Sequence, residues 1–476
     1  MLFNSIEFAL FLPITFVIYW FVVGNNLKIQ NLFLVAAGYF FYAWWDWRFL
    51  SLLILSSLID FGIGLTLSKT ESKNKRKIIL WLSILMNIGI LGFFKYFNFF
   101  IDSFQDAFTF FGYQIEAHHI NLILPLGISF YTFQTLSYTI DVYKGKMKAT
   151  NDVVAFLAFI CFFPQLVAGP IERAANLLPQ FYKKRIFEYA QASDGVRQIL
   201  WGLFKKVVIS NNCSIYVAEI FTNYDSYSGS TLFLGTVFFA FQIYADFSGY
   251  SDMAIGTARL FGFDLMKNFN FPYFSSNIAE FWRRWHISLT TWFRDYIYYP
   301  LGGSLFSKWK TARNVMIIFL VSGFWHGANW TFLVWGFLNA LYFLPSLLLE
   351  RKKEVNSNKW SIQKPFKILG TFFIVCVAWV FFRAPNVSTA FQYLNRLFSS
   401  SFFELPSILT PKLDMVYLMF NILFLIGIEW IQQEKEHGLD LKNVSTIKRR
   451  ILYLLVFSSI LLFGTFGKEE FIYFQF

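Results

Sequence analysis

The sequence carries little charge for its length. Only 15% of its 476 residues are Asp, Glu, Lys or Arg, whereas soluble domains contain about 25%. Hydrophobic residues make up 56%, and 64 of them are phenylalanine. A soluble globule of this size cannot bury that much apolar surface, and disordered, collagen-like and coiled-coil proteins have the opposite composition. We therefore expect an all-α integral membrane protein, in which each helix satisfies its own backbone.

Cysteine is scarce as well, and the motifs of soluble enzymes are missing. Cys161, Cys213 and Cys376 lie far apart and form no CxxC pair, so we interpret them as packing residues. The chain has no GxSxG, HExxH, Walker or GxGxxG motif. No metal site and no bound cofactor are predicted.

Long apolar runs fill most of the chain. A helix needs about 20 apolar residues to cross the bilayer core, and we expect ten to twelve spans with re-entrant and interfacial pieces. No linker or repeat divides the chain, so residues 1–476 are predicted to form one polytopic domain. The clear candidates are 6–23, 31–43, 49–67, 78–94, 120–142, 231–261, 331–349, 366–382, 413–431 and 451–466, and the weaker ones are 153–169, 196–221 and 314–330.

Basic residues outnumber acidic ones, 41 to 29. In a membrane protein this excess indicates positive-inside topology rather than nucleic-acid binding. The loop 69–77 carries five basic residues and is predicted to be cytoplasmic, whereas 95–119 is more acidic and is predicted to be a loop outside. Counting spans then places the tail 467–476 on the extracytoplasmic side.

A first polar cluster lies within an apolar run. Gln242 and Asp246 are four residues apart and share a helix face, while Asp252 falls on another face unless Ser248 and Gly249 interrupt the helix. Hydrogen bonds between helices would explain such residues. Two carboxylates at membrane depth favour a polar cavity instead.

A second cluster, 280–303, interleaves arginine, tryptophan and histidine and is too charged to span. Its basic residues include Arg283, Arg284 and Arg294, with His286 between them. An aromatic and basic belt at the cytoplasmic interface is one interpretation. The functional alternative is a positively charged entrance to a binding site for a ligand that carries phosphates.

The third cluster surrounds His326, which lies in an apolar run with Trp325 and Asn329 and is flanked by Gly323 and Gly327. A hydrogen-bonded core histidine is the ordinary explanation. Burial also favours the neutral imidazole that a general base requires. The remaining histidines fall in expected loops, where we predict that they are solvated: His118, His119 and His437.

Seven segments of the chain match the motifs of a known family in the same order: 2–5, 130–134, 164–173, 242–252, 281–286, 325–330 and 471–476. They resemble the membrane-bound O-acyltransferase family, in its bacterial branch that modifies alginate, peptidoglycan and teichoic acid. The resemblance implies a ring of tilted helices around a central funnel, with His326 as the catalytic residue and His286 as a second essential polar group.

The same resemblance implies a donor, a partner and a location. The donor substrate would be cytoplasmic acetyl-CoA, bound by Arg283, Arg284 and Arg294 together with Trp325 and Asn329. The partner would be a serine-dependent acetyltransferase of the SGNH type outside a bacterial plasma membrane. No Ser or Cys nucleophile motif is present, which favours direct transfer from the thioester over an acyl-enzyme of that kind.

The tail 467–476 suggests an acyl carrier. Seven extended residues before Tyr473 span at most ~23–25 Å, which exceeds half of the ~30 Å bilayer core. The Phe-x-Tyr-x-x-Phe spacing of residues 471–476 resembles the C-terminal motif of a small partner protein in the teichoic-acid system that is proposed as an acyl carrier. We therefore hypothesise that Tyr473 accepts acetyl with His326 as base, whereas an aromatic anchor at the interface is the alternative.

Three functions stay open from the sequence. The first is an acetyl-CoA-dependent O-acetyltransferase for an exported or cell-wall polysaccharide. The second is a transporter or flippase for a glycan precursor, since broken helices and buried carboxylates also occur there. The third is a non-catalytic scaffold in a secretion complex.

Overall fold

The computed structural model describes residues 1–24, 26–115, 118–305, 307–348, 363–407, 412–442, 444–467 and 471–472. These residues form helices and connecting loops, and no strand occurs among them, so the all-helical prediction is confirmed. The chain divides into two compact units: residues 1–195 with 254–266, and residues 196–253 with 267–476. A single domain over 1–476 and a central funnel stay predictions.

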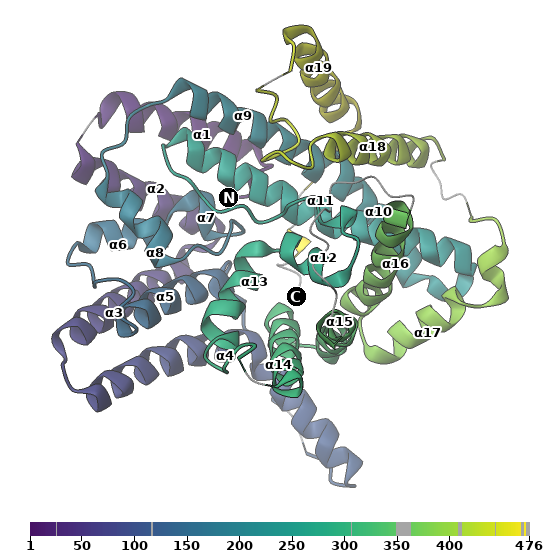
Figure 1. Cartoon of the computed structure of the whole chain (residues 1–476), viewed down its shortest axis with the longest axis horizontal. Coiled ribbons are helices and arrows are strands. Elements are labelled where there is room, and N and C mark those ends of the chain that lie inside the picture. The colour runs from purple at the N-terminus through teal and green to yellow at the C-terminus, as the bar shows by residue number, and fades with distance from the viewer. Residues whose placement is uncertain are drawn as a thin grey trace. The chain divides into compact units, whose positions relative to one another are not determined.

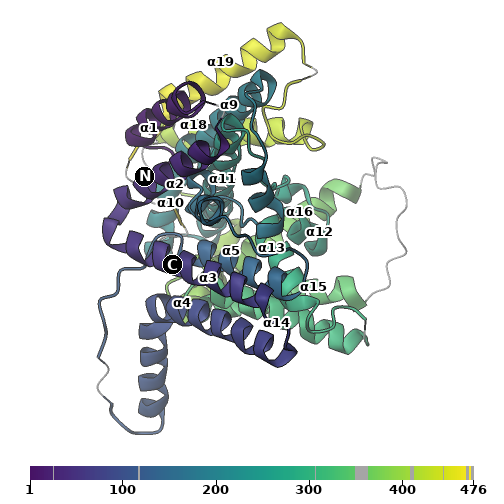
Figure 2. The ribbon, with the colours of Figure 1, turned by 90° about the vertical axis from the view of Figure 1, so that its left-hand side faces the viewer.

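The first unit is built around α5, a helix whose side chains are almost all buried. It packs against α3 and α4, which Figure 2 shows side by side. The helices of this unit are α1 (Ile6–Val17), η1 (Ile18–Val22), α2 (Leu27–Asp46), η2 (Trp47–Phe49), α3 (Leu50–Lys69), α4 (Lys73–Phe110), α5 (Ile128–Tyr143), α6 (Val153–Ile160), α7 (Phe163–Leu166), α8 (Ala174–Leu177) and η3 (Leu178–Tyr182).

A buried polar network holds α3, α4 and α5 together. Asp60 on α3 is fully buried and accepts hydrogen bonds from Ser83 Oγ (2.8 Å) and Asn87 Nδ2 (2.9 Å) on α4. Thr135 Oγ1 on α5 donates to Asn87 Oδ1 at 3.0 Å. Because an unsatisfied buried carboxylate is costly, this network specifies how the three helices pair.

The second unit is the larger one, and α9 (Tyr189–Phe204) and α11 (Gly229–Leu260) contribute residues to both units. Figure 1 shows α14 next to α15, which is followed by α16. Its other helices are η4 (Lys205–Ser210), α10 (Asn211–Thr222), η5 (Tyr224–Ser226), η6 (Pro272–Phe274), α12 (Ile278–Arg284), α13 (Ile287–Phe293), η7 (Arg294–Tyr298), α14 (Lys308–His326), α15 (Trp330–Leu348), α16 (Gln363–Arg383), α17 (Val387–Leu397), η8 (Ser400–Phe403), α18 (Lys412–Ile431) and α19 (Thr446–Phe463).

Glycines set the close approach of α14 and α15. A Cβ on Gly323 would lie 2.2 Å from the carbonyl oxygen of Phe332, and a Cβ on Gly336 would lie 2.3 Å from that of Phe319. The two backbones therefore touch where a larger residue would separate them. This packing fixes the end of α14, where His326 lies.

Six helical stretches of the described chain are long and apolar enough to cross a membrane: 27–69, Lys73–Phe110, Gly229–Leu260, Trp330–Leu347, Gln363–Arg383 and Leu413–Ile431. The prediction of ten to twelve spans stays open. Two boundaries were wrong. α4 continues to Phe110 because its aromatic residues extend past 94 without a glycine or proline, and α5 begins only at Ile128 because Pro125 and the left-handed Gly127 interrupt the run.

Candidate active site

The two histidines singled out by sequence line one cavity of about 420 Å³ in the second unit. Its walls come from α12, α13, η7, α14 and α15, and most of them are apolar or aromatic, among them Trp282, Phe319 and Phe343. A mostly apolar cavity with few polar groups suits a ligand whose reactive group is held by specific hydrogen bonds. The fold thus brings His286 and His326 to one place.

His286 occupies an unusual backbone conformation between α12 and α13. Its φ of 43° is in the left-handed region, where it forms the N-cap of α13. Asn268 holds this turn: its carbonyl oxygen accepts from Ile287 N (2.9 Å), and its Oδ1 accepts from Ser288 Oγ (2.9 Å). A strained residue so firmly held is typical of a functional site. Sequence reasoning missed Asn268, because no motif spacing marks it.

The His286 imidazole is 1% exposed, and neither ring nitrogen has a hydrogen-bond partner in the described part of the chain. The Phe247 ring lies 4.6 Å away, nearly perpendicular to it. His286 lies outside the apolar spans, and burial lowers its pKa from 6.5 to about 3, so the ring is neutral at physiological pH. A neutral ring with unused nitrogens at a cavity wall can donate to a ligand oxygen.

His326 is the last residue of α14 and is 3% exposed. Its ring lies 5.0 Å from Trp325, 5.1 Å from Trp335 and 5.3 Å from Phe382. Trp325 is also 6.0 Å from the His286 ring, so one indole contacts both imidazoles. Aromatic rings therefore pack around both imidazoles and restrict their rotation.

Asn329 lies in the turn between α14 and α15. Its Nδ2 donates to the carbonyl oxygen of Pro385 at 2.9 Å, and its Oδ1 accepts from Thr331 N at 2.9 Å. These bonds brace the turn that follows His326, and Asn329 is not among the residues that line the cavity.

Of the three predicted donor-binding arginines, Arg294 borders the cavity. Its exposed guanidinium pairs with Asp295 at 2.8 Å. Arg284 forms an ion pair with Glu280 at 2.7 Å, and Arg283 is exposed on α12. Among the described residues, neither Arg283 nor Arg284 is part of the cavity wall.

The carboxylates of α11 form buried ion pairs instead of lining the histidine cavity. Lys206 Nζ lies 2.6 Å from Asp246 Oδ1, and Lys205 Nζ donates to Asp252 at 2.5 Å. Gln198 Nε2 also donates to Asp252, at 2.9 Å. Gln242 is half-buried on the same helix. Sequence reasoning missed Lys205 and Lys206, although two consecutive lysines in an apolar run are the natural partners of membrane-depth carboxylates.

α11 runs unbroken through Ser248 and Gly249, so the interruption considered from sequence does not occur. Gly249 serves helix packing: a Cβ there would lie 2.8 Å from the carbonyl oxygen of Gly202 on α9. Asp246 and Asp252 consequently reach different lysines from different faces of one regular helix.

Tyr473 lies outside the described residues. The two residues before it are described and buried: Phe471 is 0% exposed and Ile472 is 3% exposed. The Phe471 ring lies 5.4 Å from Phe247 and 4.8 Å from Tyr250, both on α11. Phe471 and Ile472 thus pack inside the second unit.

The remaining histidines divide into two groups. His118 and His119 are exposed, as predicted. His437 is 2% exposed and its Nδ1 accepts from Leu439 N, so the prediction of a solvated side chain was wrong: a local turn folds the ring inward. The three cysteines are free and buried, in agreement with a packing role.

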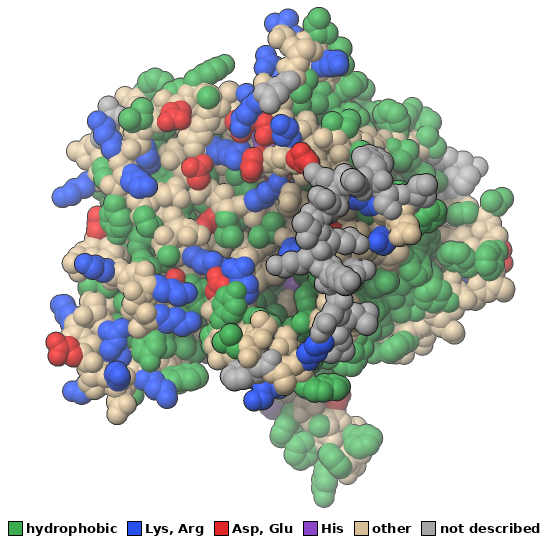
Figure 3. All heavy atoms as spheres, viewed as in Figure 1, with side chains coloured by type: hydrophobic (Ala, Val, Ile, Leu, Met, Phe, Trp, Pro, Cys, Tyr) green, Lys and Arg blue, Asp and Glu red, His purple; other side chains and the backbone are tan. Residues whose placement is uncertain are grey.

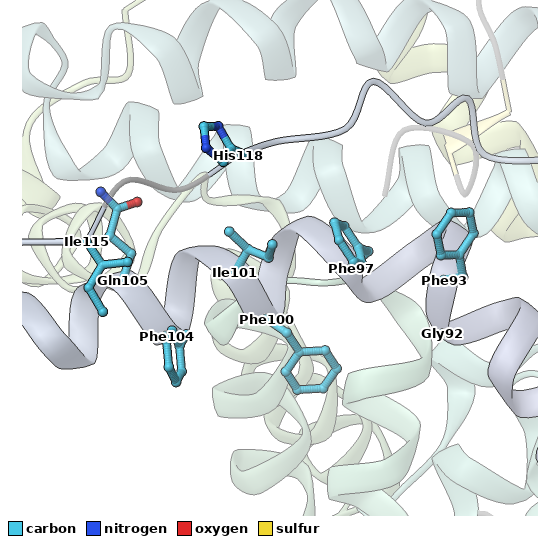
Figure 4. Close-up of a pocket in the computed structure, with 9 residues that line it drawn as sticks. All are labelled: Gly92, Phe93, Phe97, Phe100, Ile101, Phe104, Gln105, Ile115 and His118. Carbon is cyan, nitrogen blue, oxygen red and sulfur yellow. The ribbon is translucent and has the colours of Figure 1, made fainter.

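A second cavity, of about 560 Å³, lies in the first unit along the C-terminal half of α4 (Figure 4). It is lined by aromatic residues of the helix, including Phe93 and Phe97, and by Ile115 and His118 of the following loop. None of the predicted site residues contributes to this cavity.

Comparisons with known proteins agree on one family. The profile of the membrane-bound O-acyltransferase family matches residues 148–384, which include both cavity histidines. The chain is 36% identical to the probable alginate O-acetylase AlgI of Pseudomonas putida, over 100% of both chains. It is 39% identical to that of Azotobacter vinelandii, over 84% of this chain and 78% of the relative. It is 32% identical to the peptidoglycan O-acetyltransferase of Helicobacter pylori, over 100% of this chain and 98% of the relative. With both histidines inside the matched segment, the chain belongs to the membrane-bound O-acyltransferase family and is a multi-pass membrane acyltransferase.

Proposed function

We propose that this enzyme takes acetyl from cytoplasmic acetyl-CoA and passes it across the membrane for O-acetylation of an exported or cell-wall polysaccharide. The observation that carries the proposal is the placement of His286 and His326 on one cavity inside the family-matched segment. The names of the relatives, alginate O-acetylase and peptidoglycan O-acetyltransferase, support acetyl as the group transferred.

In this mechanism the two histidines have different tasks. His326 removes the proton from the accepting hydroxyl as its oxygen attacks the thioester carbonyl. His286, kept neutral by burial, donates a hydrogen bond to the carbonyl oxygen as negative charge develops on it. The carbon–sulfur bond then breaks, and the proton on His326 passes to the CoA thiolate.

Arg294 supplies the donor contact, because an exposed guanidinium at the cavity edge suits a phosphate of CoA. Arg283 and Arg284 on the neighbouring α12 add positive charge nearby. Figure 3 shows Lys and Arg side chains interspersed with Asp and Glu on the face in view. The positive-inside rule associates a basic segment such as 283–294 with the cytoplasm, which supports donor binding from the cytoplasmic side of a bacterial plasma membrane.

Tyr473 is the proposed first acceptor. Its phenol oxygen would form an ester with the acetyl group and later give it to an extracytoplasmic serine acetyltransferase of the SGNH type. The support is the burial of Phe471 and Ile472 in the same unit as the cavity, with Phe471 against Phe247 and Phe247 against His286.

The test is reconstitution of the purified protein in lipid with radiolabelled acetyl-CoA. Wild type should release CoA and retain label on Tyr473, whereas His326→Ala should do neither. The matched control is His119→Ala, which removes an exposed histidine and should behave as wild type. Label retained by Tyr473→Phe would refute the tyrosine carrier and leave the transferase standing. If wild type released no CoA, acetyl-CoA would be refuted as the donor. If wild type instead transported a glycan across the membrane, the alternative function of a flippase would be supported.

A further inference from the structure

The Asp246–Lys206 pair is one of two adjacent buried ion pairs in the second unit, and it differs from its neighbour in one respect. Both side chains are 2% exposed, and Lys206 Nζ lies 2.6 Å from Asp246 Oδ1. The approach is not aligned as a hydrogen bond, so the attraction is mainly Coulombic. The lysine therefore contacts one oxygen of the carboxylate and leaves the second oxygen available.

That second oxygen binds the C-terminal segment. The backbone N–H of Ile472 donates to Asp246 Oδ2 at 2.7 Å, a short bond of the kind formed with charged acceptors. Phe471 reinforces the contact, because its ring packs against Phe247 and Tyr250, one residue after and four residues after Asp246 on α11. A carboxylate, an N–H and two aromatic contacts thus define the location of this segment.

The chain is attached to the same region a few residues earlier. After α19, Thr465 N donates to the carbonyl oxygen of Val207, and Asn211 Nδ2 donates to the carbonyl oxygen of Thr465 at 2.7 Å. Asn212 Nδ2 donates to the carbonyl oxygen of Phe463 at 2.9 Å. Lys206, the partner of Asp246, lies on η4 next to Val207. The contacts of the chain before residue 468 and after residue 470 are therefore made by neighbouring residues of η4, α10 and α11.

We infer that the buried Asp246–Lys206 pair is a docking site for the chain's own C-terminal segment, and that Asp246 is a positioning residue for the chain end. Docking stands on these contacts alone, whereas its use for placing an acyl carrier rests on the proposed function. The neighbouring Asp252–Lys205 pair has no such contact with the described tail, because its carboxylate is used by Lys205 and Gln198.

Cysteine accessibility tests docking without any acyl chemistry. The full-length protein carrying Ile472→Cys would be treated with a maleimide in detergent or nanodiscs. The native cysteines are 0–1% exposed and give the background in the parent protein. We expect the thiol of the Ile472→Cys variant to react slowly. The additional change Asp246→Ala should speed this reaction by at least about tenfold, because the tail then opens locally.

Asp252→Ala is the matched control, since it also removes a carboxylate from a buried lysine but leaves the tail contact intact. It should leave the rate at position 472 unchanged. If Asp246→Ala fails to fold, the double change Asp246→Leu with Lys206→Met removes both charges and leaves no unpaired charge in the protein interior. This double variant should still expose the tail. Gel filtration and thermal unfolding establish that each variant is folded.

Two results would overturn the inference: fast labelling at 472 in the parent, or equal labelling in the Asp246 and Asp252 variants. Failure of the proposed function is distinguishable from either. If the tail is protected and Asp246→Ala exposes it, but acetyl labelling is the same in both proteins, docking stands and the carrier role fails.

Discussion

The ring of Phe247 lies 4.6 Å from the imidazole of His286 at an interplanar angle of 78°. Phe247 also contacts Phe471 at 5.4 Å. One aromatic side chain on α11 therefore joins a cavity histidine to the end of the chain. A change of Phe471 should for this reason reach His286 through the ring of Phe247.

Gly323→Ala should weaken the α14–α15 pair. The added Cβ would meet the carbonyl oxygen of Phe332 at 2.2 Å, and forcing the helices apart should lower the free energy of unfolding by about 1–3 kcal/mol. Thermal unfolding in detergent measures this. Gly370→Ala, on α16 with open space around the new methyl group, is the control and should be neutral or stabilising. Equal effects of the two changes would rule out close packing as the cause.

Asn268→Ala should loosen the turn at His286. It removes the acceptor of Ser288 Oγ and a donor to Ser251 Oγ, both buried, at a cost of about 1–3 kcal/mol. We expect acetyl transfer to fall more than donor binding, because the left-handed His286 loses its support. The measurement is kcat against KM for acetyl-CoA. A change in thermal stability alone, with kcat intact, would show that the turn does not position the histidine.

Stability should depend on pH through His286. Burial holds the pKa of folded His286 near 3, below the ordinary 6.5 of the unfolded chain, so only the unfolded state gains a proton between these values. Stability should be level above pH 6.5 and fall below it, by up to about 1.4 kcal/mol per pH unit. Thermal unfolding of wild type and His286→Gln at pH 7 and 5 tests this, since the variant should lose that part of the pH dependence.

Arg294→Ala should raise KM for acetyl-CoA by about tenfold, the equivalent of one charge-assisted hydrogen bond, and leave kcat closer to its original value. Arg283→Ala should have a smaller effect, because Arg283 is exposed and does not border the cavity. Steady-state kinetics with acetyl-CoA separate the two. If Arg283→Ala raised KM more than Arg294→Ala, the donor site would have to be assigned to α12 instead.

Much of the architecture was predictable because composition and apolar runs report directly on a lipid environment. The positions of α11, α15, α16 and α18 were close to those expected. The partners of Asp246 and Asp252 were not predictable, because pairing with Lys206 and Lys205 depends on how α11 packs against η4. Asn268 escaped notice for a similar reason: its importance comes from contacts with Ser288 and Ser251 that only the fold creates.

The two adjacent lysines of η4 also fix a register. Lys205 and Lys206 are neighbours in sequence, yet they pair with carboxylates six residues apart on α11. Apolar ridges can slide past one another in lipid, since lipid tails solvate them equally well. The charged residues resist such sliding, because a shift of one residue would separate both pairs and leave Lys205, Lys206 and Asp246 buried without their partners. The two ion pairs therefore fix the position of α11 along η4.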